Sequence, residues 1–213
     1  MAGRSLLDAV PGVPCSFLLL RVSFALLSRT WHVPDETWQS VEIAHGLVFG
    51  YGYKTWEWRN DIALRTYLYP LLFYPSFTIL KILGMDSPWI LVLIPKLIQA
   101  LVSAIGDVAI FNFARRRFSR DPNFLKWFVF VYSSHWFINY CSSRTLINSL
   151  EMTLTSIGLS LYPFESHIPK PRGLRRLPST ARYVMIISLS FVLRPTTAIF
   201  WLPLLLCLSL IHI

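Results

Sequence analysis

Six apolar runs, separated by polar or basic stretches, divide the chain. They cover residues 14–31, 66–83, 88–113, 124–141, 144–163 and 182–213. Most of these runs are close to the length of about 20 apolar residues that a helix needs to cross a bilayer. The pattern therefore predicts an all-α protein whose helices pass through a membrane several times.

Two of these runs differ from the others. The 66–83 run contains two prolines, a lysine and three tyrosines, a composition that favours a helix lying in the membrane interface over one that spans. The last run is interrupted by Arg194 and Pro195. That interruption predicts either one kinked helix or two shorter ones.

The composition supports a membrane protein, because 54% of the residues are hydrophobic and only 15% are charged. A formal net charge of +9 would suggest a nucleic-acid partner in a soluble protein. Here most of the basic excess lies in two short loops, near 114–123 and 164–181, without interleaved aromatic residues. We therefore expect no nucleic acid as a partner and interpret both loops as cytoplasmic.

These orientations fix a domain organisation. With the 66–83 run lying flat, residues 1–13 form a cytoplasmic N-terminus and 14–31 an uncleaved first transmembrane helix. Residues 32–87 form one large luminal segment, and 88–213 contain the further transmembrane helices. The polar turn around Arg144 and the Arg194 interruption then face the lumen as well. Three polar patches are thus predicted to converge on one face of the membrane.

The luminal segment begins with two adjacent carboxylates, Asp35 and Glu36, after Pro34. Pro34 is typical of a helix start, so Asp35 is either a simple helix cap or a functional acid. In a helix over 35–46 the two carboxylates point about 100° apart, which disfavours a pair sharing one proton. One carboxylate acting alone as a general base on a hydroxyl fits better. The acids of this segment do not form a metal-ligand cluster.

Other side chains suit sugar and phosphate chemistry. Trp56 beside Glu57 offers an aromatic face and a carboxylate to a sugar ring, although an interfacial aromatic belt would have the same composition. Arg65, Arg144 and Arg194 are each able to hold a phosphate. The argument is strongest for Arg194, because an unpaired cation inside an apolar segment is costly.

Arg21 is a different case. It lies about 10 Å along the first span from the predicted cytoplasmic end. Asp107 lies at a similar depth in the 88–113 run, which passes in the opposite direction. Since each charge alone would be expensive in the membrane, we predict a buried structural ion pair between them.

Together these residues resemble the glycosylphosphatidylinositol (GPI) mannosyltransferases of glycosyltransferase family 22, and most closely the branch that adds the third mannose. The resemblance starts near residue 14 and covers most of the chain. Its motifs follow in order: Val33-Pro34-Asp35-Glu36, Trp38-Gln39-Ser40, Val48-Phe49-Gly50-Tyr51-Gly52-Tyr53, Thr55-Trp56-Glu57-Trp58, Arg65-Thr66-Tyr67-Leu68-Tyr69-Pro70, Ser143-Arg144-Thr145-Leu146-Ile147-Asn148 and Arg194-Pro195-Thr196. Val33 departs from the histidine that often precedes Pro-Asp-Glu in the broader family.

The resemblance implies the N-terminal part of a GT-C glycosyltransferase fold in the endoplasmic reticulum membrane, with its active site facing the lumen. It implies an inverting α-1,2 transfer of mannose from dolichyl-phosphate mannose to a GPI precursor glycolipid. Asp35 would be the base, and Arg194 and Arg144 would stabilise the leaving phosphate. Glu36, Gln39, Trp56 and Glu57 would shape the sugar site. It implies no certain cofactor and leaves metal dependence and protein partners open.

Three alternatives remain at this point. One is a related dolichyl-phosphate-mannose-dependent enzyme, acting on the fourth GPI mannose or on N-glycan precursors. Another is a catalytically inactive, truncated membrane form, because members of the family are longer and the C-terminal half of the fold would be missing here. The third is a transporter, which the clustering of polar residues at one face disfavours.

Overall fold

The computed structural model describes the chain except residues 1–11, 60, 63, 119–121, 163–178 and 212–213. Its described residues form helices and connecting loops, with no strand among them. The predicted all-α class is therefore confirmed.

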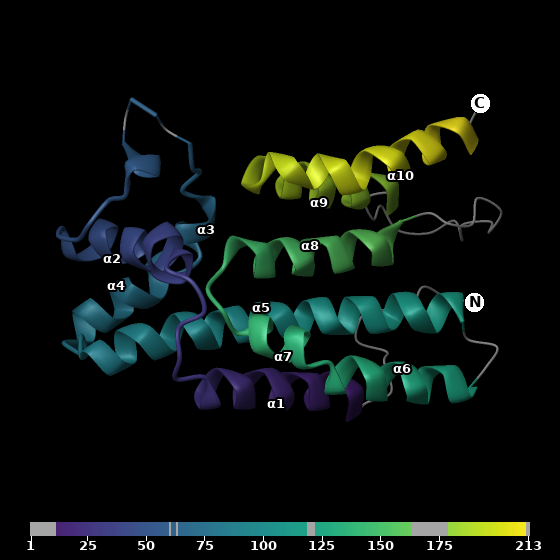
Figure 1. The fold of residues 1–213 in the computed structure, drawn as a ribbon, viewed down its shortest axis with the longest axis horizontal. Helices are drawn as coiled ribbons and strands as arrows, with labels where there is room; N and C mark the ends of the chain where they lie inside the picture. The colour runs from purple at the N-terminus through teal and green to yellow at the C-terminus, as the bar shows by residue number, and fades with distance from the viewer. Residues whose placement is uncertain (1–11, 60, 63, 119–121, 163–178, 212–213) are drawn as a thin grey trace.

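Long helices lie side by side and form a bundle (Figure 1). From one edge to the other, α1 (Gly12–Leu27) packs on α5 (Pro88–Arg117), α5 on α8 (Ile147–Leu161), and α8 on α9 (Ser179–Leu193). The final helix, α10 (Ala198–Ile211), continues beside α9. Gly106 of α5 lies so close to α8 that an added Cβ would come within 3.0 Å of the Thr153 Cα. Small residues at such contacts are typical of helix packing in membranes.

A group of short helices covers one end of this bundle (Figure 1). It consists of η1 (Thr37–Val41), α2 (Glu42–Phe49), η2 (Trp56–Trp58), α3 (Leu68–Leu71) and α4 (Tyr74–Leu83). The 66–83 run therefore forms two short helices. The longer of these, α4, has 10 residues and is about 15 Å long, half the thickness of a hydrocarbon core. Its predicted position in the membrane interface stays a prediction.

Buried apolar side chains join this end group to the bundle. Tyr69, Phe73 and Phe77 pack with Leu154 of α8 and Leu193 of α9, together with Ala44 and Leu80. The end group is thus fixed over the beginning of α8 and the end of α9, where the predicted polar turns lie.

One helix boundary differs from those that the sequence pattern predicts, and another follows one of its two alternatives. The 124–141 run is broken at His135 into α6 (Pro122–Ser134) and α7 (Trp136–Ser142), because His135 adopts an extended conformation and its Nδ1 accepts the Ile138 N–H. The prediction of one continuous helix was wrong. The last run is split by η3 (Pro195–Thr197), as the two-helix alternative required.

The described part of the first basic stretch lies at the opposite end of the bundle. Helix α5 continues to Arg117 and carries three arginines in its last turn, where they complement the helix dipole. Residues 114–117 are therefore helical, and the predicted loop begins later than expected. In the second basic stretch, residues 164–178 lie outside the described part of the chain and 179–181 already belong to α9.

Among the described residues, α5 is the one helix that is both long and apolar enough to cross a membrane by length and composition. It has 30 residues. Shorter apolar helices cover Gly12–Leu27, Ala181–Leu193 and Pro195–Ser209.

The predicted ion pair between Arg21 and Asp107 is confirmed. Arg21 Nε lies 2.6 Å from Asp107 Oδ2, and both side chains are fully buried. Further partners complete the cluster: Tyr132 donates to Asp107 at 2.7 Å, and Arg21 Nη1 donates to Asn139 Oδ1 at 2.6 Å and to Ser142 Oγ at 3.2 Å. The pair therefore ties α1 to α5, α6 and α7.

Candidate active site

Asp35 lies in the first turn of the helix that continues through η1 into α2. The backbone N–H groups of Thr37 and Trp38 both donate to the Pro34 carbonyl at 3.1 Å, so this helix begins without a side-chain cap. The Asp35 side chain is exposed and forms no hydrogen bond or ion pair with the described residues. The interpretation of Asp35 as a helix cap was therefore wrong, and its carboxylate is open to a ligand.

Glu36 has the opposite surroundings although it is the next residue. It is 6% exposed, and its Oε1 accepts the His32 N–H at 2.8 Å. Its Oε2 lies 3.4 Å from Nη1 of Arg144, whose side chain is fully buried. The two neighbouring carboxylates are thus separated in role, because Glu36 is held inside the protein and Asp35 is not.

Arg144 makes several contacts with the chain that leads into the site. Its Nη1 donates to the Thr30 carbonyl, its Nη2 donates to Thr30 Oγ1 at 3.2 Å, and its guanidinium lies 4.4 Å from the centre of the Tyr140 ring. Since no part of its side chain reaches the surface, this geometry favours a positioning role over direct contact with a phosphate.

The π-helical segment η1 brings Ser40 against the same turn. Ser40 Oγ donates to the Thr145 carbonyl at 2.9 Å, and Thr145 Oγ1 donates to the Glu36 carbonyl at 2.8 Å. Short π segments are rare and are often found at functional sites. The helix that carries Asp35 is therefore fixed to the Ser143–Thr145 turn through both side chains and backbone.

Three of the predicted site residues come together beside η2. Arg65 Nη2 donates to Glu57 Oε1 at 3.0 Å, and Gln39 Nε2 donates to the same oxygen at 3.4 Å. Trp56 is 58% exposed, whereas Trp58 is buried against Tyr67. Only Trp56 therefore presents an indole face on which a sugar ring can stack.

The loop between α2 and η2 is held by Glu42, whose Oε1 accepts the Tyr53 N–H at 2.9 Å. Gly52 has a φ of +149°, and an added Cβ would lie 2.9 Å from the same Oε1. The loop thus needs glycine both for its conformation and for the closeness of Glu42. His45 packs on Phe49 and Tyr51.

Arg194 lies at the same end of the bundle, between α9 and α8. Its Nη1 donates to Asn148 Oδ1 and to Glu151 Oε2, both at 2.8 Å. Glu151 Oε1 in turn accepts the Thr197 hydroxyl at 2.8 Å. The Arg194 side chain remains 35% exposed, and its other nitrogens have no partner among the described residues, so they are free to bind an anion.

Beneath the site, the Tyr69 hydroxyl donates to Gln99 Oε1 at 2.9 Å. Burial, and secondarily the charge of Glu36, raises the pKa of Tyr69 well above its usual value. Tyr69 therefore stays neutral, and its hydroxyl remains a donor to Gln99, which joins α3 to α5.

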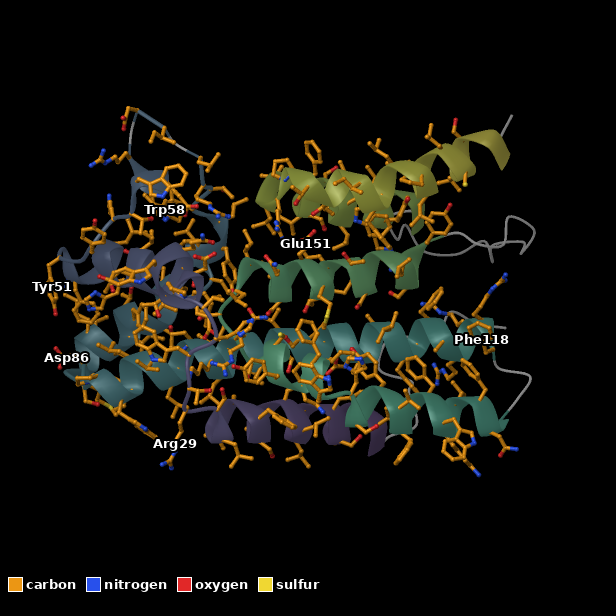
Figure 2. All side chains as sticks on the ribbon, viewed as in Figure 1. Arg29, Tyr51, Trp58, Asp86, Phe118 and Glu151 are labelled. Atoms are coloured by element: carbon orange, nitrogen blue, oxygen red, sulfur yellow. The ribbon has the colours of Figure 1, made fainter. Side chains whose placement is uncertain are left out.

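The predicted site residues belong to the group of short helices and loops around η1 and η2, to the turn before α8 and to the turn after α9. Tyr51 and Trp58, which are labelled in Figure 2, mark the end of the bundle that this group covers. The structure links the predicted site residues in three groups: Glu36 with Arg144, Gln39 with Glu57 and Arg65, and Arg194 with Glu151. No hydrogen bond or ion pair between described residues joins Asp35 to any of them. Within the same residues, no three His, Cys, Asp or Glu side chains gather in a group that could hold a metal ion.

Sequence reasoning missed the residues that hold the predicted ones. Glu151 and Asn148 fix Arg194, and Thr30 and Ser40 fix the Asp35 helix. An acid within an apolar run was a signal for Glu151, because such a charge requires a partner. No comparable signal marked Thr30, and Ser40 was identified only as part of the Trp38-Gln39-Ser40 motif, without a role of its own.

Comparison with known proteins gives a consistent result. The profile of the Alg9-like mannosyltransferase family matches residues 14–212. The GPI alpha-1,2-mannosyltransferase 3 of Homo sapiens is 41% identical over 188 residues, which are 88% of this chain and 32% of the human protein. GPI mannosyltransferase 3 of Drosophila melanogaster is 42% identical over 196 residues, which are 92% of this chain and 30% of that protein.

A fungal relative agrees with these two. GPI mannosyltransferase 3 of Yarrowia lipolytica is 40% identical over 181 residues, covering 85% of this chain and 34% of the relative. The chain thus spans about a third of the length of the curated relatives it matches, less than the half that the resemblance implied. No solved structure matches the chain significantly.

Proposed function

Because the chain belongs to the Alg9-like mannosyltransferase family, we propose that it forms part of a membrane glycosyltransferase of GPI-anchor biosynthesis. The reaction is transfer of the third mannose, in α-1,2 linkage, from dolichyl-phosphate mannose to a GPI precursor. Relatives named GPI alpha-1,2-mannosyltransferase 3 in several vertebrates support this assignment over the fourth-mannose and N-glycan alternatives.

The proposed placement is a multi-pass protein of the endoplasmic reticulum membrane with the Asp35 end facing the lumen. The arrangement of polar groups supports it, because the group of short helices that carries Asp35 and the arginine-rich end of α5 lie at opposite ends of the bundle (Figure 2). The buried Arg21–Asp107 pair lies between these ends, on helices that would be inside the bilayer.

In the proposed mechanism, Asp35 accepts the proton of the acceptor hydroxyl as its oxygen attacks C1 of the mannose. The bond between C1 and the phosphate oxygen breaks, and dolichyl phosphate leaves with the electron pair. Attack from the face opposite the phosphate inverts C1, and it needs one base together with stabilisation of the leaving anion.

The proposal rests on the different surroundings of the two neighbouring carboxylates. Asp35 is exposed and has no partner among the described residues, whereas Glu36 is buried on Arg144 and His32. Of the two acids, only Asp35 is in a position to accept a proton from a substrate. Glu36 and Arg144 position it by holding the helix start.

The roles of the other site residues follow from the exposure of their side chains and from the hydrogen bonds that they already make. Trp56 stacks on a sugar ring, and Glu57, Gln39 and Arg65 bind its hydroxyl groups around η2. Arg194 binds the departing phosphate through the nitrogens that Glu151 and Asn148 leave free. The contact between Arg194 and the phosphate grows stronger as negative charge develops on the phosphate, and the contacts around η2 respond to the flattening of the sugar ring.

Activity can be tested in cells lacking the third-mannose enzyme. The chain and a chimera, in which its residues replace the matching segment of the human relative, are compared for rescue of GPI-anchored surface proteins. We expect the chimera to rescue and its Asp35→Asn variant to lose more than about 100-fold of the transfer rate. Asp61→Asn, in the same segment and equally exposed, is the matched control and should transfer normally.

The outcomes separate the hypotheses. Full rescue by the Asp35→Asn chimera would exclude a catalytic base at this position. Rescue by the chimera and not by the chain alone would mean that these residues form the base-carrying part of the enzyme but do not act by themselves, as the inactive-form alternative requires.

A further inference from the structure

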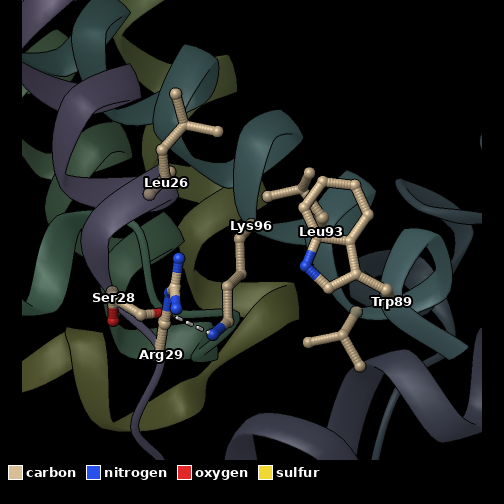
Figure 3. A pocket seen from close by; sticks show the side chains of 8 residues that line it. Leu26, Ser28, Arg29, Trp89, Leu93 and Lys96 are labelled. Atoms are coloured by element: carbon tan, nitrogen blue, oxygen red, sulfur yellow. Dashed lines mark hydrogen bonds between the residues drawn. The ribbon is translucent and has the colours of Figure 1, made fainter.

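A groove of about 370 Å³ lies between the end of α1 and the first turns of α5 (Figure 3). It is next to the candidate active site but shares none of the residues assigned above. Its lining comprises Ala25, Leu26, Ser28, Arg29, Trp89, Val92, Leu93 and Lys96.

The groove is cationic without a neutralising acid. Neither Asp nor Glu lines it, and the side chains of Arg29 and Lys96 end close to Ser28 (Figure 3). Lys96 Nζ donates to the Ser28 carbonyl at 2.9 Å, and Arg29 is exposed without a hydrogen bond or ion pair to the described residues. Ser28 Oγ is buried without a partner among the same residues. Donors are therefore concentrated here with few protein acceptors.

The depth of Lys96 makes this arrangement costly without a ligand. Lys96 lies about two turns into α5, roughly 12 Å from the start of that helix. An ionisable residue inside a membrane helix is expensive unless it has a partner, and it usually marks a functional site. A neutral carbonyl is a weaker partner for an ammonium group than an anion.

The opposite wall of the groove is apolar and open. Leu26 is 52% exposed, Val92 is 55% exposed and Trp89 is 71% exposed, on helices whose outer faces would contact lipid. Tryptophan is also typical of the membrane interface. The groove therefore offers cations at its inner side and a hydrocarbon surface along its length.

We propose that this groove binds a membrane lipid that carries a phosphate. The phosphate contacts Arg29 and Lys96, and the hydrocarbon chain lies along Leu26, Val92 and Leu93. A neutral lipid would leave both cations unpaired, and a free phosphate would not use the apolar wall. The proposal rests on the membrane placement given above and not on the transfer reaction.

Binding at this place would also reach the candidate active site. Ser28 and Arg29 lead directly to Thr30, whose carbonyl accepts a hydrogen bond from Arg144. A phosphate bound to Arg29 would therefore act on the backbone next to the residue that holds Arg144.

The probe for this proposal is farnesyl phosphate, with farnesol and inorganic phosphate as its separated halves. The full 213-residue chain is purified in dodecyl maltoside, a detergent without phosphate, and binding is measured by native mass spectrometry. We expect saturable binding of farnesyl phosphate that neither half displaces at the same concentration.

Two variants locate the binding. Lys96→Met removes a charge and Val92→Trp fills the groove while leaving both cations in place. Each is expected to weaken binding by at least about tenfold. Arg59→Met removes an exposed arginine at the same end of the bundle but outside the groove, and it should bind like the wild type.

Three results would overturn the proposal. These are unchanged affinity in the Val92→Trp variant, equal weakening by Arg59→Met, or competition by inorganic phosphate at the affinity of the lipid. Failure here would leave the proposed transferase intact, since the Asp35→Asn comparison does not involve the groove. If the Lys96→Met variant does not fold, the affinity of the Val92→Trp variant for farnesyl phosphate still tests the proposal.

Discussion

At the scale of single residues, the Arg21–Asp107 pair gives the clearest stability prediction. Arg21→Met would leave the buried Asp107 with Tyr132 as its remaining donor among the described residues. Removing one partner of a buried pair typically lowers the free energy of unfolding by about 3–5 kcal/mol. We expect a loss of that size in thermal unfolding of the detergent-purified protein.

The exchanged pair tests whether the interaction, and not merely the arginine, matters. The double variant Arg21→Asp with Asp107→Arg should recover only part of the stability that Arg21→Asp loses. Recovery is partial because Asn139 Oδ1 and Ser142 Oγ accept hydrogen bonds from Arg21, and an aspartate at position 21 cannot donate to them. A double variant no more stable than the single one would show that the two charges are not coupled.

Gly52 gives a second prediction at this scale. Gly52→Ala must adopt a φ of +149° and place a Cβ 2.9 Å from Glu42 Oε1. We expect it to release the Tyr53 contact and to cost about 1–3 kcal/mol, detectable as faster proteolysis within residues 50–59. Gly46→Ala is the matched control, because its Cβ would meet the Tyr51 carbonyl at an ordinary 3.6 Å.

The residue scale also shows what a sequence can predict about a site. The Arg21–Asp107 pair was predictable because two costly charges lay at matching depths on antiparallel helices. The contact between Glu36 and Arg144 was not, because 108 positions separate them and nothing local identifies either as the other's partner. Whether Asp35 or Glu36 was the free acid depended on that contact, so the distinction needed the three-dimensional structure.

At the scale of helices, the fit of α8 against α10 depends on a glycine. A Cβ on Gly158 would lie 2.6 Å from Trp201 Cη2, and Trp201 is 2% exposed, so its indole has little room to move. We expect Gly158→Ala to separate these helices and to cost about 1–3 kcal/mol. Thermal unfolding of the purified protein measures this.

A double-mutant cycle provides the control. The double variant Gly158→Ala with Trp201→Leu should lose less stability than the sum of the losses of the two single variants. The smaller side chain at position 201 leaves space for the added methyl group. If the two changes instead add independently, the contact between Gly158 and Trp201 is not the cause.

Helix boundaries were predictable where a residue type enforces them and not elsewhere. Pro195 removes a backbone donor, and a split at this position was anticipated. The break at His135 was not, since its neighbours contain neither proline nor glycine, and the two serines that precede it do not by themselves end a helix. That break depends on a local bond from the Ile138 N–H to the histidine ring, which the hydrophobic pattern does not record.

At the scale of the whole molecule, the bundle separates two kinds of polar residue. One end carries the exposed acid, the aromatic loop and Arg194, and the other carries the arginine-rich end of α5 (Figure 1). Basic residues are retained on the cytoplasmic side of membrane helices, so this separation predicts orientation as well as function.

Labelling of single cysteines tests that orientation. After replacement of Cys15, Cys141 and Cys207 by serine, a cysteine is introduced at Lys54 or at Phe118, which are both exposed. Lys54 lies in the loop between Tyr51 and Trp58, and these two residues are at the opposite end of the bundle from Phe118. In sealed microsomes, whose cytoplasmic face is outward, a membrane-impermeant maleimide should modify Phe118→Cys directly. It should modify Lys54→Cys only after permeabilisation, because a luminal thiol is separated from the reagent by the bilayer. The reverse pattern would place Asp35 on the cytoplasmic side and remove it from a luminal glycolipid, whereas labelling of both positions would mean that α5 does not cross the membrane.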